Sequence, residues 1–84
     1  MENTTERFSD RLIWFFGKCS EKLIENNGKG DWRNLSDEQL HTLLLNEMDE
    51  LREAFEVGVS EEIIRECADV ANFAMMIASN NARL

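Results

Sequence analysis

The sequence predicts an all-α fold, a three-helix protomer that assembles into a multi-helix bundle. Two observations support this prediction. Apolar residues recur at three- and four-residue steps in three segments, and two turn signals separate these segments cleanly. The 84 residues contain no proline and no internal repeat. We therefore expect residues 1–84 to form a single helical domain.

The first helix is expected over residues 4–26, where the Asn-Asn-Gly sequence at 26–28 supplies a left-handed stop. A loop over residues 28–34 follows and holds Trp32 between charged residues. The predicted apolar stripe of this helix is wide and partly aromatic. It consists of Phe8, Leu12, Phe15, Phe16, Cys19 and Leu23.

The second helix is expected over residues 36–56. Ser36 and Gln39 have the spacing of a capping box, and Gly58 ends the helix. The third helix is expected over residues 60–80, with Ser60 as the N-cap and two glutamates in the first turn. Stripes this wide are hard to bury within three helices, so self-association is expected.

Composition excludes several classes of protein. A hydrophobic content of 43% is too high for a disordered chain, and a net charge of −8 disfavours binding to a nucleic-acid backbone. The longest apolar run, residues 12–16, is far shorter than the roughly 20 residues that span a membrane. The first residues lack the pattern of a secretory signal, so a cytoplasmic protein is expected. Cys19 and Cys67 lack metal-site spacing and are expected to be small buried hydrophobes.

Acidic residues interrupt the apolar stripes of the second and third helices. Glu47 and Glu50 occupy the middle of a stripe of leucines, alanine and phenylalanine. Glu66 and Asp69 repeat the arrangement in the third helix. Residues three apart lie on one helix face, so both pairs are predicted to point inward. Four acids gathered in a low dielectric would repel one another, and divalent cations would relieve this repulsion.

Mg²⁺ is the expected cation, with Mn²⁺ as an alternative, because hard cations take oxygen ligands and often share them with substrate phosphates. A di-iron bundle would require histidines next to the acids. His41 is rotated away from Glu47 and is expected at the surface or rim. Glu-x-x-Glu pairs are common on solvated helices, so the prediction depends on two such pairs in apolar settings on consecutive helices.

The segments NEMDEL at 46–51 and ECADV at 66–70 resemble the E-x-x-E … E-x-x-D signature of the MazG-like, all-α nucleoside triphosphate pyrophosphohydrolases, a superfamily that includes dimeric dUTPases. Many members have a second glutamate where this chain has Asn46. The resemblance implies that (d)NTPs are cleaved to (d)NMP and pyrophosphate by homodimers or homotetramers. It also implies that four residues bind the metal and are catalytic, one of them as a base: Glu47, Glu50, Glu66 and Asp69.

Substrate phosphates need basic partners, and several residues are candidates for binding the substrate. Trp32 is expected to stack on the base, whereas Trp14 is expected in the core or in a subunit interface. Asn72 is expected to bind either the base or sugar, or a buried backbone group. The basic candidates are Lys18, Lys22, Lys29 and Arg33. The alternative function is a non-enzymatic oligomerisation or regulatory module whose acids bind a structural ion or pair across an interface.

Overall fold

The computed structural model describes residues 4–26 and 32–83 and contains only helices and turns within these ranges. The predicted all-α fold is therefore confirmed for the described part of the chain. The elements are α1 (Thr4–Glu25), the short 3₁₀ helix η2 (Trp32–Asn34), α2 (Asp37–Val57) and α3 (Ser60–Ala82).

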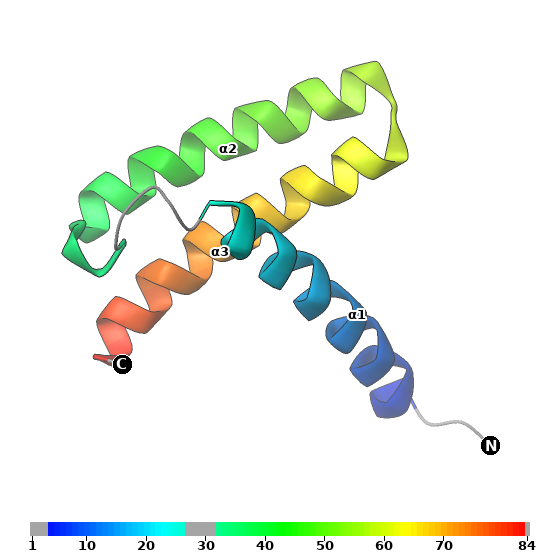
Figure 1. Cartoon of the computed structure of the whole chain (residues 1–84), viewed down its shortest axis with the longest axis horizontal. Helices are drawn as coiled ribbons and strands as arrows, with labels where there is room; N and C mark the ends of the chain where they lie inside the picture. Colours follow the sequence, from blue (N-terminus) through cyan, green and yellow to red (C-terminus); the bar gives the residue numbers. More distant parts are fainter. Residues whose placement is uncertain (1–3, 27–31, 84) are drawn as a thin grey trace.

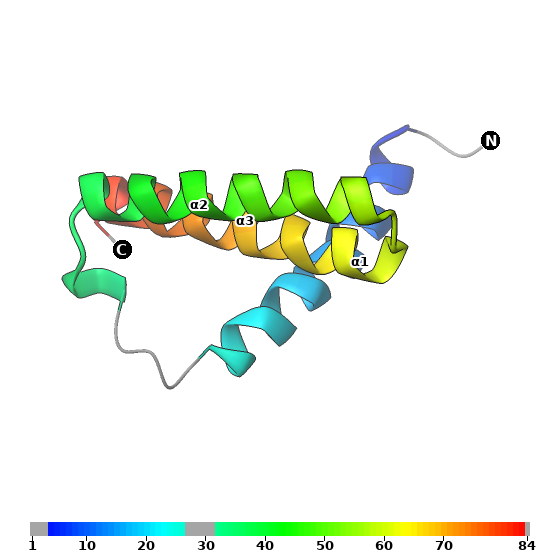
Figure 2. The same cartoon turned by 90° about the horizontal axis from the view of Figure 1, so that it is seen from above.

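Helices α2 and α3 form an antiparallel hairpin, and α1 crosses α3 at a steep angle (Figure 1). In the view from above α2 lies in front of α3 (Figure 2), and Figure 1 shows that the two helices move apart toward the C-terminal end of α3. Helix α3 packs against α2, α1 and η2, whereas α1 and α2 are not neighbours among the described residues. The Cα radius of gyration is 14.4 Å, larger than the about 12 Å typical of a compact domain of this length. The described part of the chain is therefore open on the side of α1.

The predicted capping signals of α2 are confirmed. The Gln39 amide donates to Ser36 Oγ at 3.1 Å, and the Ser36 amide donates to Gln39 Oε1 at 2.9 Å. At the other end Gly58 has φ 82°, and its N–H donates to the Ala54 carbonyl at 2.9 Å. A side chain is strained in this left-handed conformation, so glycine is the residue that ends the helix here.

The predicted N-cap of α3 is wrong by one residue. Val59 is the N-cap, in an extended conformation, and its side chain makes no capping hydrogen bond. Ser60 is already the first helical residue. The reason is the very tight connection: the left-handed Gly58 reverses the chain, and one extended residue suffices to start the next helix. The acidic first turn, Glu61 and Glu62, is present as predicted.

The hydrophobic core among the described residues is small. Four apolar residues of α2 and α3 are buried: Leu40, Ala54, Ala68 and Met76. Asp69 and Asn72 are also buried, so polar groups make up part of the interior. At the end of the hairpin, Asn81 Nδ2 donates to Asp37 Oδ2 at 2.7 Å and joins the end of α3 to the start of α2.

The predicted stripe of α1 is only partly covered. Cys19 and Leu23 are half-buried where α1 meets α3, but Phe16 is 72% exposed and Leu12 is 67% exposed. Trp14 is also exposed, so it does not belong to the core of the single chain. The cause is the crossing geometry, because a helix that packs against one neighbour at an angle buries only the residues near the crossing. None of the described helices has the length and apolarity needed to cross a membrane.

Candidate functional site

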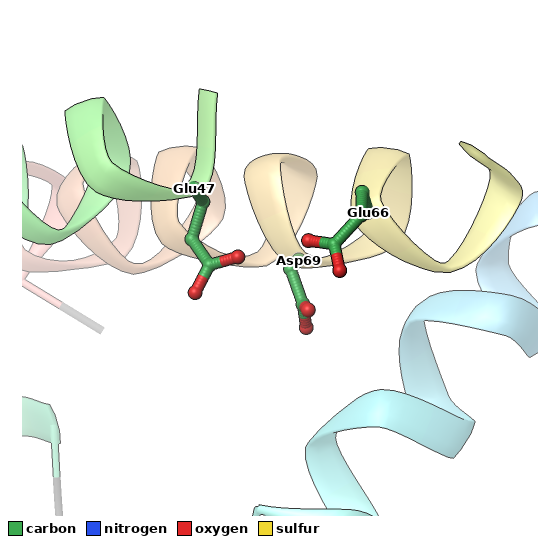
Figure 3. Close-up of side chains that lie close together, drawn as sticks. All are labelled: Glu47, Glu66 and Asp69. Carbon is green, nitrogen blue, oxygen red and sulfur yellow. The ribbon is translucent and has the colours of Figure 1, made fainter. Parts of the chain in front are cut away.

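Three carboxylates from two helices meet near the middle of the hairpin. Glu47 comes from α2, and Glu66 and Asp69 come from α3, one turn apart. One oxygen from each side chain lies within 4.8 Å of the other two. Figure 3 shows Glu47 and Asp69 directed away from the hairpin on the side where α1 lies, with the Glu66 carboxylate beside them. We call Glu47, Glu66 and Asp69 the acid cluster.

The acid cluster is poorly compensated by hydrogen bonds. Asp69 is only 8% exposed, and Glu47 and Glu66 are half-buried. Glu47 Oε2 and Glu66 Oε2 are both shielded from solvent, and neither has a hydrogen-bond partner. A buried carboxylate oxygen without a partner is destabilising and binds either a proton or a cation.

Burial and like charge raise the pKa values throughout the acid cluster. Burial, together with the adjoining carboxylates of Glu50 and Asp69, raises the pKa of Glu47 to about 8. Burial and the charges of Glu50 and Asp69 also raise the pKa of Glu66. Burial raises the pKa of Asp69, although Lys22 opposes the shift. At neutral pH the acid cluster therefore retains a proton, and a cation that binds there would displace it.

Glu50 lies beside the acid cluster but not within it. Its side chain is exposed, which corrects the prediction that both acids of α2 point inward. Three residues advance a helix by about 300°, so Glu50 is rotated by about 60° from Glu47, toward the solvent edge of the packed face. Its carboxylate is still close enough to raise the pKa values of Glu47 and Glu66.

Lys22 brings α1 to the acid cluster. Its Nζ lies 3.4 Å from Asp69 Oδ2 and 3.4 Å from Glu25 Oε2, and only 14% of its side chain is exposed. Burial acts to lower the pKa of Lys22, but Asp69 and Glu25 outweigh this effect and leave the pKa raised. The ammonium group is therefore charged at neutral pH and partly neutralises Asp69.

Glu25 and Arg65 extend this contact into an ion-pair network between α1 and α3. The Arg65 guanidinium donates to both oxygens of Glu25, at 3.1 Å and 2.8 Å. Sequence reasoning missed both residues. The available signal was the spacing of Glu25 from Lys22, which places the two side chains on one face of α1. Arg65 gave no comparable signal, because its partner lies 40 residues away in the sequence.

The other predicted binding residues have different surroundings. Asn72 is buried, and its Nδ2 donates to the Cys19 carbonyl at 3.0 Å, so it binds a backbone group of α1. Lys18 Nζ lies 4.0 Å from Glu21 on its own helix. Trp32 is half-buried in η2, which packs against α3, and Arg33 is exposed. These residues do not contribute to the acid cluster, and Lys29 lies outside the described residues.

Two further expectations concern His41 and the cysteines. His41 is exposed on α2, as predicted, and does not belong to the acid cluster. Cys19 and Cys67 are free thiols and half-buried, somewhat less enclosed than expected. The donor set of the candidate site therefore consists of carboxylate oxygens, which favours hard cations over zinc or iron.

The geometry of the acid cluster suits a small divalent cation. Magnesium binds oxygen at about 2.0–2.1 Å, so two ligands on opposite sides of the ion lie about 4.2 Å apart. Ligands at adjacent positions of an octahedral ion lie closer, about 3 Å apart. The three carboxylate oxygens, all within 4.8 Å of one another, would therefore have to draw together for all three to bind one ion directly. A bound cation would also give the two unpartnered oxygens of Glu47 and Glu66 a partner.

Comparison with known proteins gives one relative without an assigned function. The chain is 48% identical over 46 residues to an uncharacterized protein of Archaeoglobus fulgidus. The matched region covers 55% of this chain and 50% of that protein, so the chain spans about half the length of the relative. No family model matches the chain, and no solved structure matches it.

Proposed function

We propose that the chain is a metal-dependent nucleoside triphosphate pyrophosphohydrolase that cleaves (d)NTPs to (d)NMP and pyrophosphate. The observation that carries the proposal is the acid cluster, with two buried carboxylate oxygens that lack a partner. Lys22 adds a positive charge 3.4 Å from the cluster, where a phosphate would need one. The resemblance of 46–51 and 66–70 to the MazG-like signature supplies the reaction.

The polar residues at the site have three roles in this proposal: metal binding, proton acceptance and phosphate binding. Glu47, Glu66 and Asp69 hold Mg²⁺, or Mn²⁺ in its place, through carboxylate oxygens. The cation supplies positive charge that binds phosphate oxygens and stabilises charge that develops during phosphoryl transfer. Glu50, exposed at the edge of the cluster, accepts a proton from the attacking water. Lys22 binds a phosphate oxygen.

Self-association is part of the proposal. Helix α1 exposes six large hydrophobic side chains, a surface that a second copy of the chain would cover in a homodimer or homotetramer. These side chains are Phe8, Leu12, Ile13, Trp14, Phe16 and Ile24. The proposed roles of Trp32 in stacking on the base, and of Lys18 and Arg33 in binding phosphates, rest on the sequence alone.

The same exposed surface supports a second candidate function, a non-enzymatic oligomerisation or regulatory module. In that case the acid cluster would hold a structural ion or pair with basic residues of another subunit. The two functions differ in the effect of neutralising one acid. If the acid cluster is catalytic, the variant protein loses hydrolysis and still assembles. If the acid cluster is structural, the variant protein no longer assembles.

The test is pyrophosphate release from a panel of canonical and modified (d)NTPs, with Mg²⁺ or Mn²⁺ present. Glu66→Gln removes one charge of the acid cluster and is expected to lower the rate by about 100-fold or more. Glu53→Gln is the matched control, because Glu53 is an exposed acid of α2. It should retain the rate of the unmodified chain.

Two results would contradict the proposal. One is the absence of pyrophosphate release across the whole panel from a folded, metal-loaded protein. The other is equal loss of activity in the Glu66 and Glu53 variants, which would indicate a general effect of surface charge. Either result, combined with loss of assembly in Glu66→Gln, would favour the oligomerisation module.

A further inference from the structure

The contact between Lys22 and Asp69 places one positive side chain where a cation would bind. Asp69 Oδ2 is the atom that Lys22 approaches, at 3.4 Å, and Asp69 is also a member of the acid cluster. The side chains are 14% and 11% exposed, so the pair is largely withdrawn from water. A divalent ion bound to Asp69 would repel the ammonium group strongly, because charges interact more in such surroundings than in water.

Lys22 has a second acceptor that can retain it. Glu25 lies 3.4 Å from Nζ on the same helix, one turn further along. Two hydrogen bonds from Arg65 fix the Glu25 carboxylate. If Lys22 leaves Asp69, its ammonium group therefore stays at the edge of the acid cluster instead of moving into solvent.

We infer that Lys22 is an exchangeable counter-ion: it neutralises Asp69 in the metal-free protein, and a divalent cation releases it to bind the polyphosphate of the incoming substrate. This inference rests on the proposed function and adds an order of events to it. The metal binds first and exposes the lysine, and the anion then meets two positive groups, the cation and Lys22. Glu25 acts as a positioning residue that holds Lys22 near the site in both states.

The inference predicts opposite effects of one substitution on two ligands. Lys22→Gln removes the charge that competes with the metal, so the affinity for Mn²⁺ alone should rise by about tenfold. The same variant lacks a phosphate partner, so the affinity of the metal-loaded protein for pyrophosphate should fall by about tenfold. Arg52→Gln is the matched control, since it also removes one positive charge, and Arg52 is an exposed residue of α2 that pairs with Asp49, so neither affinity should change.

A measurement on the unmodified chain tests the release of Lys22 from Asp69 directly. It requires no variant, so it cannot fail because a variant does not fold. Acylation of lysine amines, read by mass spectrometry at each site, reports how free each Nζ is. Adding Mg²⁺ should increase the rate at Lys22 several-fold and leave the rate at Lys18 unchanged. An unchanged rate at Lys22 in a protein that binds Mg²⁺ by calorimetry would overturn the inference.

The remaining outcomes separate the inference from the proposed function. Opposite affinity changes without hydrolysis of any nucleotide would support the inference and contradict the pyrophosphohydrolase. Hydrolysis with unchanged affinities in Lys22→Gln would support the enzyme and overturn the inference. If calorimetry detects binding of neither Mg²⁺ nor Mn²⁺ to the unmodified chain, both the inference and the proposed function are overturned.

Discussion

The acid cluster and the apolar surface of α1 depart from the usual distribution of residues in opposite ways. In the cluster, carboxylates occupy buried positions where apolar residues are expected, and two of their oxygens lack a partner. In α1, Phe16 and Leu12 are exposed where burial is expected. Both arrangements are unfavourable in an isolated chain, because buried charge and exposed apolar surface each raise its free energy. Such departures from folding rules are typical of functional surfaces.

The largest effect is expected in stability, where the core of the α2–α3 hairpin should contribute far more than the exposed surface of α1. Leu40, in the core of the α2–α3 hairpin, is fully buried, so Leu40→Ala should lower the free energy of unfolding by about 2–5 kcal/mol. Leu12→Ala, at a 67% exposed position of α1, should change it by no more than about 0.5 kcal/mol in the monomeric chain. Urea denaturation of both variants at low protein concentration tests this contrast. Equal losses would show that α1 is part of the folding core.

The second prediction concerns the exposed surface of α1. Phe16→Glu should weaken self-association, because burying a phenylalanine contributes about 1.5–3 kcal/mol and a charge at the same position opposes contact. The expected change is at least tenfold in the dissociation constant, measured by sedimentation velocity. Arg11→Glu is the control on the same helix, since Arg11 is polar and exposed. A monomeric unmodified chain at high concentration would contradict the prediction.

The third prediction is that neutralising a member of the acid cluster stabilises the metal-free protein. Glu66→Gln removes one repelling charge and introduces an amide that can donate to Glu47 or Asp69. The expected gain is about 1–3 kcal/mol, the size of the penalty for a buried polar group without a partner. Thermal denaturation in the presence of a chelator measures it. A loss of stability would show that Glu66 pairs with a cationic group and would favour the structural role.

The fourth prediction is a pH dependence that the cation should reverse. The pKa of Glu47 is about 8 in the folded chain, against an ordinary value of 4.5. At a pH between these two values, Glu47 is therefore protonated in the folded state and ionised in the unfolded state. The stability that this proton contributes is complete below about pH 4.5 and is lost as the pH rises through about 8. The melting temperature of the metal-free protein should therefore fall between pH 5 and pH 8.

Excess Mg²⁺ supplies the contrast for this pH series. The cation binds ionised carboxylates, so its stabilising effect should increase over the same interval. Glu47→Gln should flatten the metal-free profile, because the group that titrates has been removed. A metal-free profile of the unmodified chain that rises from pH 5 to pH 8 would contradict the assignment of a raised pKa to Glu47.

The smallest effect is expected at the ion pair between Arg65 and Glu25, at the edge of the contact between α1 and α3. Both groups are accessible to solvent, so Arg65→Gln should reduce stability only slightly. The reduction should disappear near 1 M salt, where screening acts within about 3 Å. A larger loss that persists in high salt would show that this pair, instead of the apolar contacts of Cys19 and Leu23, holds α1 on the hairpin.

Some of the fold follows from local sequence alone. The capping box of Ser36 and Gln39 and the left-handed Gly58 could be predicted because each depends on residues within one turn of itself. The predicted N-cap of α3 is wrong by one residue, since Val59, the single extended residue after Gly58, takes that position and Ser60 is already helical. Placing Glu66 and Asp69 on one face also needed only the helical repeat.

Contacts between helices were decided by tertiary structure. The crossing of α1 over α3 determines that Lys22 reaches Asp69 and that Asn72 binds the Cys19 carbonyl, whereas Phe16 is left exposed. Residues of α1 and α3 that meet are separated by about half the chain, and periodicity within a helix does not specify the angle at which two helices cross. The sequence alone thus determined the helices and the faces that carry the acids. Packing decided which acids are buried, which basic side chain contacts them and which apolar side chains stay at the surface.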